Sequence, residues 1–272
     1  MISRILVGLG GTDFTPIAIR YAVEIGAAHH AEIHGVTVTD RRSLFALSYN
    51  SGHDAVQEMT HLHNLEQRQD HYIESLREEC KQADVRCLIN RETGDPFELM
   101  MSQSRYHDLM IFGLRSLFEG DVIKTEPSDM LSRLVSRGVR PILAVAKRYR
   151  AIRRVLLAYS GSMESAKAIR RFIQLRLWPN VELKIVTFEH ELKAAQTLLN
   201  DMTTYCRAHG YEPEVEYIPE SARQTLLKCA EDWEADEIVV GNSARTLWMK
   251  KLFGETAMHA VRHSTIPLFL SQ

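Results

Sequence analysis

Ile5-Leu6-Val7-Gly8-Leu9 is a short apolar run that is followed by the small polar loop Gly10-Gly11-Thr12. The same pattern returns 150 residues later, where Val155-Leu156-Leu157-Ala158-Tyr159 is followed by Ser160-Gly161-Ser162. Each loop leads into a segment of helical periodicity, as expected for a strand that enters a strand–helix unit. The recurrence indicates that one structural unit occurs twice in this chain of 272 residues.

Two later segments repeat as well, at a shorter separation. Asp108-Leu109-Met110-Ile111-Phe112-Gly113 matches Asp236-Glu237-Ile238-Val239-Val240-Gly241 at a separation of 128 residues. Arg140-Pro141-Ile142-Leu143-Ala144-Val145 matches Thr265-Ile266-Pro267-Leu268-Phe269-Leu270 at 126. The falling separation predicts an insertion of about twenty residues in the first half. We place it near residues 41–56, where serine, asparagine and glycine replace clean periodicity.

Short apolar runs alternate with longer segments of period 3.6 in both halves, which is the pattern of strands and helices around a parallel sheet. Right-handed connections then predict an α/β fold with two doubly wound, Rossmann-like parallel sheets in tandem. The domains are predicted at 1–148 and 152–272, joined by a basic linker. The predicted strands are Arg4 to Leu9, Glu32 to Thr39, Val85 to Asn90, Leu109 to Gly113, Pro141 to Val145, Arg154 to Tyr159, Glu182 to Phe188, Glu214 to Ile218, Glu237 to Gly241 and Pro267 to Leu270.

The composition is that of an ordinary globular protein, with 45% hydrophobic and 25% charged residues. The net charge of -2 gives no basic excess for binding nucleic acid or anionic lipid. No apolar run approaches the roughly 18 residues of a membrane span. Four cysteines without C-x-x-C spacing are too few to form a disulfide framework, and we expect reduced thiols. These features predict a cytoplasmic protein that binds neither nucleic acid nor membrane.

Ligands of doubly wound sheets bind beyond the carboxyl ends of the strands, where the strand order reverses. This rule selects the two loops after the first strands and the loops that begin at Gly113 and Gly241. A glycine there lets backbone N–H groups approach a phosphate, and a helix N-terminus adds a positive dipole. Glycine after a strand also serves turn geometry alone, so both interpretations remain open.

The second half carries a recognisable motif. Gly241-Asn242-Ser243-Ala244, nine residues and then Gly254-Glu255-Thr256 resemble the ATP motif of the universal stress protein family. The tail from Ala260 to Leu268 is similar to that family's closing helix and strand, and Gly94-Asp95-Pro96 is similar to its turn after strand three. The resemblance implies a tandem form with the adenine nucleotide alpha hydrolase-like fold, acting as a regulatory stress-response module without catalytic residues and with at most weak ATP hydrolysis.

The resemblance also implies a ligand site in the second half for an adenine nucleotide, ATP or AMP. No metal is implied beyond magnesium bound to the nucleotide. The implied residues are Tyr159, Ser160, Gly161, Ser162, Val186, Gly241, Ala244, Arg245, Gly254, Glu255 and Thr256. Arg245 would neutralise phosphate charge near a helix start. The alternative for these residues is a turn followed by a helix with solvated basic side chains.

The chain departs from the family pattern at several positions. Family members that bind ATP place an aspartate after strand one, whereas Gly10 and Ser160 occupy that position here. Ala244 replaces a glycine of the motif, and Glu255 replaces its serine or threonine. The first half departs further, because Gly113 is the only motif glycine that it keeps at that loop. We therefore expect the second half to bind the nucleotide and the first half to serve as a scaffold.

Two other functions remain open. One is a nucleotide-independent scaffold that acts through protein contacts made by the insertion and by a long helix predicted from Glu58 to Gln82. The other is an enzyme of the ATP pyrophosphatase type, because Gly10-Gly11-Thr12-Asp13 resembles the core of its S-G-G-x-D-S loop. The competing interpretation of Asp13, which we favour, is an N-cap for a helix that begins near Thr15-Pro16.

Histidines cluster in the first half at His29, His30, His34, His53, His61, His63 and His71. Their spacing does not fit a metal site, so a solvated helix surface is the default expectation.

The last strand of each half is apolar and would be an unpaired edge. The resemblance implies that single-copy relatives form dimers through this strand, so we predict that the two final strands pair with each other and form an internal pseudo-dimer. A further homodimer of whole chains remains open.

Overall fold

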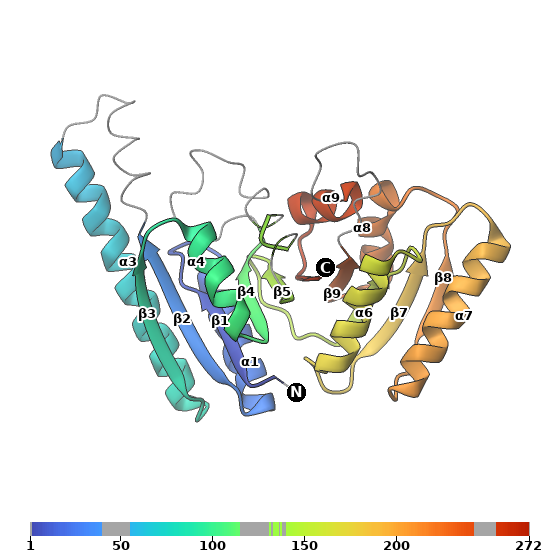
Figure 1. Cartoon of the computed structure of the whole chain (residues 1–272), viewed down its shortest axis with the longest axis horizontal. Helices are drawn as coiled ribbons and strands as arrows, with labels where there is room; N and C mark the ends of the chain where they lie inside the picture. Colours follow the sequence, from blue (N-terminus) through green and yellow to red (C-terminus); the bar gives the residue numbers. More distant parts are fainter. Residues whose placement is uncertain are drawn as a thin grey trace.

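The structure is a computed structural model that describes residues 2–39, 55–114, 131, 133–135, 137, 140–241 and 254–271. Strands and helices alternate in both halves (Figure 1). The first half contains β1 (Arg4–Gly8), α1 (Thr15–His29), β2 (Glu32–Thr39), α3 (Ala55–Gln82), β3 (Cys87–Thr93), α4 (Pro96–Gln103), a 3-10 turn (Ser104–Tyr106), β4 (Leu109–Gly113) and β5 (Ile142–Val145). The second half contains β6 (Arg154–Ala158), α6 (Met163–Leu175), β7 (Glu182–Thr187), α7 (Leu192–Ala208), β8 (Glu214–Tyr217), α8 (Ala222–Asp232), β9 (Glu237–Gly241), α9 (Glu255–His263) and β10 (Leu268–Ser271).

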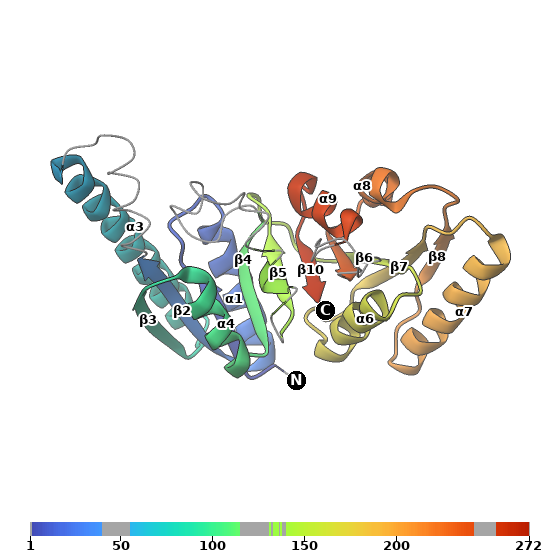
Figure 2. The same ribbon diagram turned by 45° about the horizontal axis from the view of Figure 1, so that its top comes forward.

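All ten of these strands form one sheet in the order β3-β2-β1-β4-β5-β10-β9-β6-β7-β8. Within each half the strands are parallel and follow the same order, with the first strand between the second and the fourth. The strand β5 pairs with β10 in the antiparallel direction, so the two halves meet at the middle of the sheet (Figure 2). This confirms the predicted pairing of the two final strands and the α/β class.

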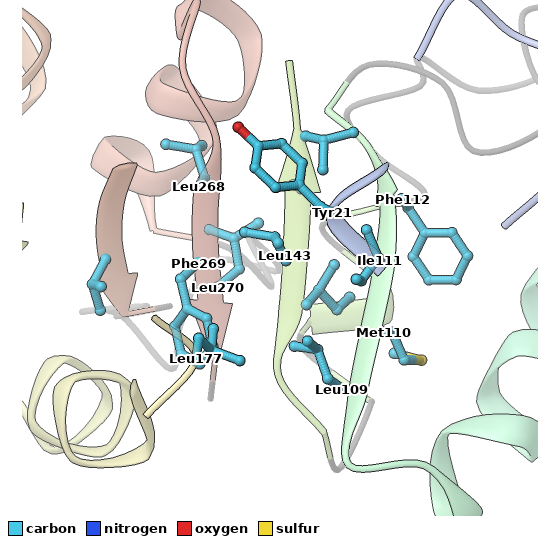
Figure 3. Close-up of a cluster of buried hydrophobic side chains, with 14 of the residues drawn as sticks. Tyr21, Leu109, Met110, Ile111, Phe112, Leu143, Leu177, Leu268, Phe269 and Leu270 are labelled. Atoms are coloured by element: carbon cyan, nitrogen blue, oxygen red, sulfur yellow. The ribbon is translucent and has the colours of Figure 1, made fainter. Parts of the chain in front are cut away.

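Apolar side chains fill the seam between the halves. Leu143 of β5 lies opposite Phe269 of β10, and both are fully buried (Figure 3). The ring of Phe269 also packs edge to face against Phe172 of α6, with 5.4 Å between the ring centroids. Burial of this kind contributes about 25 cal/mol for each Å² of apolar surface removed from water. The seam is therefore part of one continuous core that spans both halves.

The linker adds polar contacts between the halves. The Tyr21 hydroxyl of α1 donates a hydrogen bond of 2.8 Å to the carbonyl oxygen of Arg150. The Arg150 guanidinium in turn donates to the carbonyl oxygen of Ala235, which precedes β9, at 3.1 Å. The Tyr21 ring lies 5.7 Å from the ring of Trp178, which follows α6. The basic linker is thus anchored between the two halves.

Helices cover both faces of the sheet, as right-handed crossovers require. The helix α1 packs against α3, and α8 packs against α9. Doubly wound sheets bind ligands at the carboxyl ends of the strands where the strand order reverses, between the connection from the first strand and the connection from the fourth. The crevice between these two connections lies at the carboxyl ends of β1 and β4 in the first half, and of β6 and β9 in the second.

Most sequence-predicted boundaries agree with the structure to within one or two residues. The strands β2, β4 and β9 have the predicted ends, whereas β3 ends three residues later than predicted. The long helix α3 begins at Ala55, slightly before the predicted start, and extends past the sheet in Figure 1. The predicted insertion lies almost wholly outside the described residues. No helix in the described part of the chain is long and apolar enough to span a membrane.

Candidate functional site

The crevice of the second half begins with the loop that joins β6 to α6. Gly161 in this loop has a φ of +72°, a left-handed conformation that glycine adopts without steric cost. Gly11 has a φ of +75° at the corresponding position of the first half. The two loops therefore share a backbone turn, and in both a glycine permits it. The two copies therefore agree in backbone conformation at this position, as the predicted duplication leads us to expect.

Three serine hydroxyls meet at the start of α6. Ser162 is the N-cap residue, and its hydroxyl oxygen accepts a hydrogen bond from the backbone N–H of Ser165 at 3.2 Å. The Ser160 hydroxyl lies 3.0 Å from the Ser162 hydroxyl and 3.2 Å from the Ser165 hydroxyl. Ser160 is exposed, whereas Ser165 is buried. The cluster therefore presents neutral hydrogen-bonding groups at a helix N-terminus, where anions are favoured.

Gly241 ends β9 directly beneath this helix start. A Cβ atom at Gly241 would lie 2.5 Å from both the Cα and the backbone nitrogen of Ser165. Real Cβ contacts are not that short, so only glycine permits this approach of strand and helix. Gly241 thus allows the end of β9 to lie close to the start of α6.

The second helix of the candidate site is α9, which begins after its N-cap residue Gly254. Glu255 is the first residue of this helix and is exposed. Its carboxylate forms an ion pair of 3.6 Å with Arg223, near the start of α8. Thr256 is partly buried in the first turn. The acidic residue that replaces the motif serine or threonine therefore pairs with a neighbouring helix.

Of the remaining predicted residues, two lie beside the serine cluster and two lie outside the part of the chain that the structure describes. Val186 is buried in β7, and its carbonyl oxygen accepts from the backbone N–H of Tyr159 at 2.9 Å, so these two residues lie beside the serine cluster. Burial raises the pKa of the Tyr159 hydroxyl above its usual value. Ala244 and Arg245 lie outside the described residues.

The corresponding crevice of the first half is crossed by an ion pair. The Lys147 ammonium, which follows β5, lies 2.7 Å from the carboxylate of Asp13, which follows β1. Because β4 lies between β1 and β5, this pair spans the carboxyl end of β4. The hydrogen bond from Lys147 holds the pKa of Asp13 below its ordinary value of 3.8. Met163 occupies the position of Asp13 in the second half.

This ion pair also corrects one prediction. The helix α1 begins at Thr15, as expected, but its N-cap residue is Phe14 and no side chain caps it. Asp13 pairs with Lys147 instead, so its assignment as the N-cap is wrong. The Thr12 hydroxyl oxygen accepts from the backbone N–H of Phe14 at 3.4 Å. Asp95 does cap α4, because its carboxylate accepts from Phe97 and Glu98.

Sequence reasoning missed Ser165 as part of the site. The repeat could have identified it, because Thr15, another hydroxyl residue, occupies the corresponding position of the first half. The Thr15 hydroxyl oxygen accepts from the backbone N–H of Thr12 at 3.1 Å. A hydroxyl residue three positions after the loop hydroxyl therefore closes both loops, and comparison of the two copies would have identified it.

A second missed group is Glu237, at the first position of β9. It is fully buried, and its Oε2 atom accepts from the indole Nε1 of Trp178 at 2.5 Å. Its Oε1 atom has no hydrogen-bond partner among the described residues. Burial raises the pKa of this carboxyl to about 8, so it is mostly protonated at neutral pH. Glu237 lies at the amino end of its strand, away from the crevice.

The histidine expectation needs one correction. His34 is a buried residue of β2 and does not belong to a solvated helix surface. Its Nε2 atom contacts the carboxylate of Glu32, and its ring lies 4.7 Å from that of His107. His107 is also buried, and burial lowers its pKa below 6.5. Within the described residues, no group of three acidic, histidine or cysteine side chains could hold a metal ion.

A cavity of about 530 Å³ lies near the amino end of β9, and Arg150, Ile238 and Ile266 are among its lining residues. Known ligands of doubly wound sheets bind at the opposite end of the strands. We therefore assign the candidate site to the crevice between the serine cluster and α9.

Comparison with known proteins identifies the family. A curated relative, universal stress protein Slr1230 of Synechocystis sp. (strain ATCC 27184 / PCC 6803 / Kazusa), is 21% identical over 98% of this chain and 99% of its own. A universal stress protein from Archaeoglobus fulgidus DSM 4304 has a TM-score of 0.74 at 17% identity, with 100% of this chain and 96% of that chain covered. The protein PA1789 from Pseudomonas aeruginosa PAO1, described as functionally unknown, has a TM-score of 0.60 at 18% identity, with 99% and 92% covered.

These likenesses at low identity establish the fold, a tandem arrangement of two Rossmann-like units. The family assignment comes from the sequence match. The model of the universal stress protein family matches residues 1–121 and 186–271, which is more than half of the chain. The chain belongs to the universal stress protein family.

Proposed function

We propose that this universal stress protein is a regulatory module that binds an adenine nucleotide, ATP or AMP, in a second domain at residues 152–272. The first domain, at residues 1–148, is the scaffold. Nucleotide binding changes the surface of the second domain that partner proteins contact, and any ATP hydrolysis is weak. The magnitude of such a change is limited by the difference in affinity of the nucleotide for the two states of the surface.

The serine cluster is the observation that carries this proposal. Ser160, Ser162 and Ser165 lie at the N-terminus of a 13-residue helix, in the crevice where doubly wound sheets bind ligands. The helix dipole favours phosphate there, and hydroxyls hydrogen-bond to phosphate and ribose oxygens. Gly241 brings β9 against this cluster, and Gly254 begins a second helix on the far side of the crevice.

The asymmetry between the halves supports the choice of the second one. In the first half the Asp13 carboxylate pairs with the Lys147 ammonium across the carboxyl end of β4. Met163 in place of Asp13 leaves the second crevice without this carboxylate. A phosphate in the first half would have to compete with Asp13 for the lysine, so the first half is the poorer phosphate site.

Substitution of Gly254 tests the proposal with a matched pair of variants. The residue has φ -64° and ψ +144°, which suits an N-cap, and aspartate and asparagine are both good N-cap residues. We expect Gly254→Asp to weaken ATP and AMP binding at least about tenfold, because its charge repels phosphate. Gly254→Asn has the same shape without the charge and is expected to bind within a factor of about three of the native chain.

Isothermal titration calorimetry at millimolar nucleotide measures both variants, and the native chain is expected to bind one nucleotide. Equal loss of binding in the Asn and Asp variants would remove phosphate repulsion as the cause. No binding of either nucleotide by the native chain would overturn the proposal and leave the nucleotide-independent scaffold as the function. Release of pyrophosphate during incubation with ATP would instead favour the enzyme of the ATP pyrophosphatase type.

Ser160→Asp tests the same site by gain of affinity. Ser160 occupies the place of the aspartate that the nucleotide-binding family members have after strand one, and it is exposed. A carboxylate that accepts hydrogen bonds from ribose hydroxyls contributes about 1.5–3 kcal/mol, so we expect AMP to bind at least about tenfold more tightly. Competition with a fluorescent adenosine analogue measures this change. Unchanged affinity would show that the ribose does not reach this loop.

We further propose a cytoplasmic location, because the four cysteines are free thiols in the structure and structural disulfides are rare in the cytosol. The paired final strands make the chain an internal pseudo-dimer. Association of two whole chains is a separate question that sedimentation velocity answers.

A further inference from the structure

Two of the four cysteines meet at one corner of the sheet. Cys80 lies in the last turn of α3, and Cys87 is the first residue of β3. The chain turns back between them at Asp84, which has a φ of +53°. A hydrogen bond of 2.9 Å from the backbone N–H of Val85 to the carbonyl oxygen of Cys80 closes this turn. The turn brings the end of the helix over the start of the strand.

The Cys80 and Cys87 thiols are close enough for each to shift the pKa of the other. Cys80 is 1% exposed, whereas Cys87 is only partly buried and is accessible from solvent. The Cys80 thiol and the positive charge of Arg77 lower the pKa of the Cys87 thiol. The Cys87 thiol and burial raise the pKa of Cys80. One accessible thiol that ionises easily therefore lies beside one buried thiol that does not.

The second half contains a natural comparison for this corner. Cys206 lies in the last turn of α7, and its carbonyl oxygen accepts from Tyr211 at 3.0 Å, as Cys80 accepts from Val85. The separation of 126 residues that relates these pairs assigns Pro213 to the position of Cys87. The buried cysteine thus occurs in both copies as a small core residue, whereas a partner thiol occurs only in the first.

We propose that Cys80 and Cys87 are a redox pair that hydrogen peroxide converts into an intramolecular disulfide. The Cys87 thiolate attacks one peroxide oxygen, so the S–O bond forms while the O–O bond breaks, and the leaving hydroxide takes up a proton to become water. The Cys80 sulfur then attacks the sulfenic sulfur of Cys87. The S–S bond forms, the S–O bond breaks, and the Cys80 proton leaves with the hydroxyl group as a second water. Two thiols are oxidised, and one peroxide is reduced by two electrons.

The disulfide would lock the end of α3 to the edge strand β3. Thiolate attack makes Cys87 the nucleophile and Cys80 the resolving residue, since reactivity toward peroxide follows thiolate character and access. Cys206 and Cys229 are buried, and burial raises the pKa of each to about 11, so neither reacts at a comparable rate. Reduction by a small dithiol returns the pair to its starting state.

Treatment of the purified full chain with hydrogen peroxide tests this inference. We expect the thiols counted after denaturation to fall from four to two, with a mass loss of about 2 Da for the two hydrogen atoms that disulfide formation removes. Tryptic digestion without reduction is expected to yield the peptide 78–81 joined to the peptide 87–91. Dithiothreitol is expected to restore four thiols.

Serine variants provide the matched controls. Cys206→Ser and Cys229→Ser are expected to form the same linked peptide as the native chain. Cys87→Ser is expected to keep its three thiols at that peroxide dose, and Cys80→Ser is expected to accumulate a sulfenic acid at Cys87 that dimedone traps. Far-UV circular dichroism checks the fold of each variant. A native chain that keeps four thiols, that loses Cys206 at the same rate, or that forms only disulfides between chains would overturn the proposal.

Discussion

Replacing Glu237 by glutamine is expected to abolish a loss of stability that the native chain suffers as the pH rises from about 4.5 to about 8. The carboxyl is fully buried, and among the residues that the structure describes only the Trp178 indole donates to it. Burial raises its pKa in the folded chain from 4.5 to about 8. In the unfolded chain the group is solvated and ionises near its ordinary value.

The sign follows from the protons bound in each state. Below pH 4.5 both states are protonated, so the group contributes no pH dependence. Between pH 4.5 and 8 the unfolded chain has released the proton and the folded chain has kept it, so each pH unit lowers the free energy of unfolding by up to about 1.4 kcal/mol. Above pH 8 both states are ionised. The full effect is therefore several kcal/mol.

Urea unfolding of native chain and variant between pH 5 and pH 8.5 measures this effect. The difference in the free energy of unfolding is expected to grow with pH in favour of Glu237→Gln. Glu220→Gln replaces an exposed glutamate and is the control, with a constant difference expected. Glu237→Leu copies Leu109, which occupies the same position in the first half, and should also remove the dependence. Parallel curves for native chain and Gln variant would contradict an ionisable group buried at this position.

Gly241→Ala is the second substitution for which we expect a large effect. The new methyl group would lie 2.5 Å from backbone atoms of Ser165, which cannot rotate away as a side chain can. The strand β9 and the helix α6 must separate, and both belong to the core next to the seam. Overpacking of this kind costs about 1–3 kcal/mol, and we expect a loss at the upper end of that range.

Gly210→Ala is the control that separates the effect of a steric clash from the effect of backbone strain. Gly210 has a φ of +85°, and a Cβ there would meet nothing within 4 Å, so only backbone strain of about 1 kcal/mol is expected. Urea unfolding compares the two variants. Because the serine cluster rests on β9, a folded Gly241→Ala chain should also lose nucleotide affinity, while Gly210→Ala should retain it. Equal stability losses in the two variants would mean that the helix accommodates the methyl group.

The elements that sequence alone predicted best are those with strong local signals. The ends of β2, β4 and β9 were predicted correctly because each is an apolar run bounded by turn or polar residues. The turn expected at Gly94-Asp95-Pro96 lies where β3 ends and Pro96 begins α4, within a few positions of the chain. The duplicated glycines Gly11 and Gly161 adopt the same conformation.

The predictions that failed depend on contacts between distant residues. The pairing partner of Asp13 is Lys147, 134 positions away, and this long-range ion pair competes with the local cap. His34 belongs to a strand that is covered on both faces, so its burial leaves no alternating pattern in the sequence.

The sequence by itself determined that a strand–helix unit is repeated and that each copy forms a doubly wound sheet. These properties follow from turns, caps and periodicity, which act over a few residues. Only the tertiary structure decided that Asp13 pairs with Lys147 and that Trp178 donates a hydrogen bond to the buried Glu237. Those outcomes depend on which surfaces meet when the elements pack, and packing selects partners that are far apart in the chain.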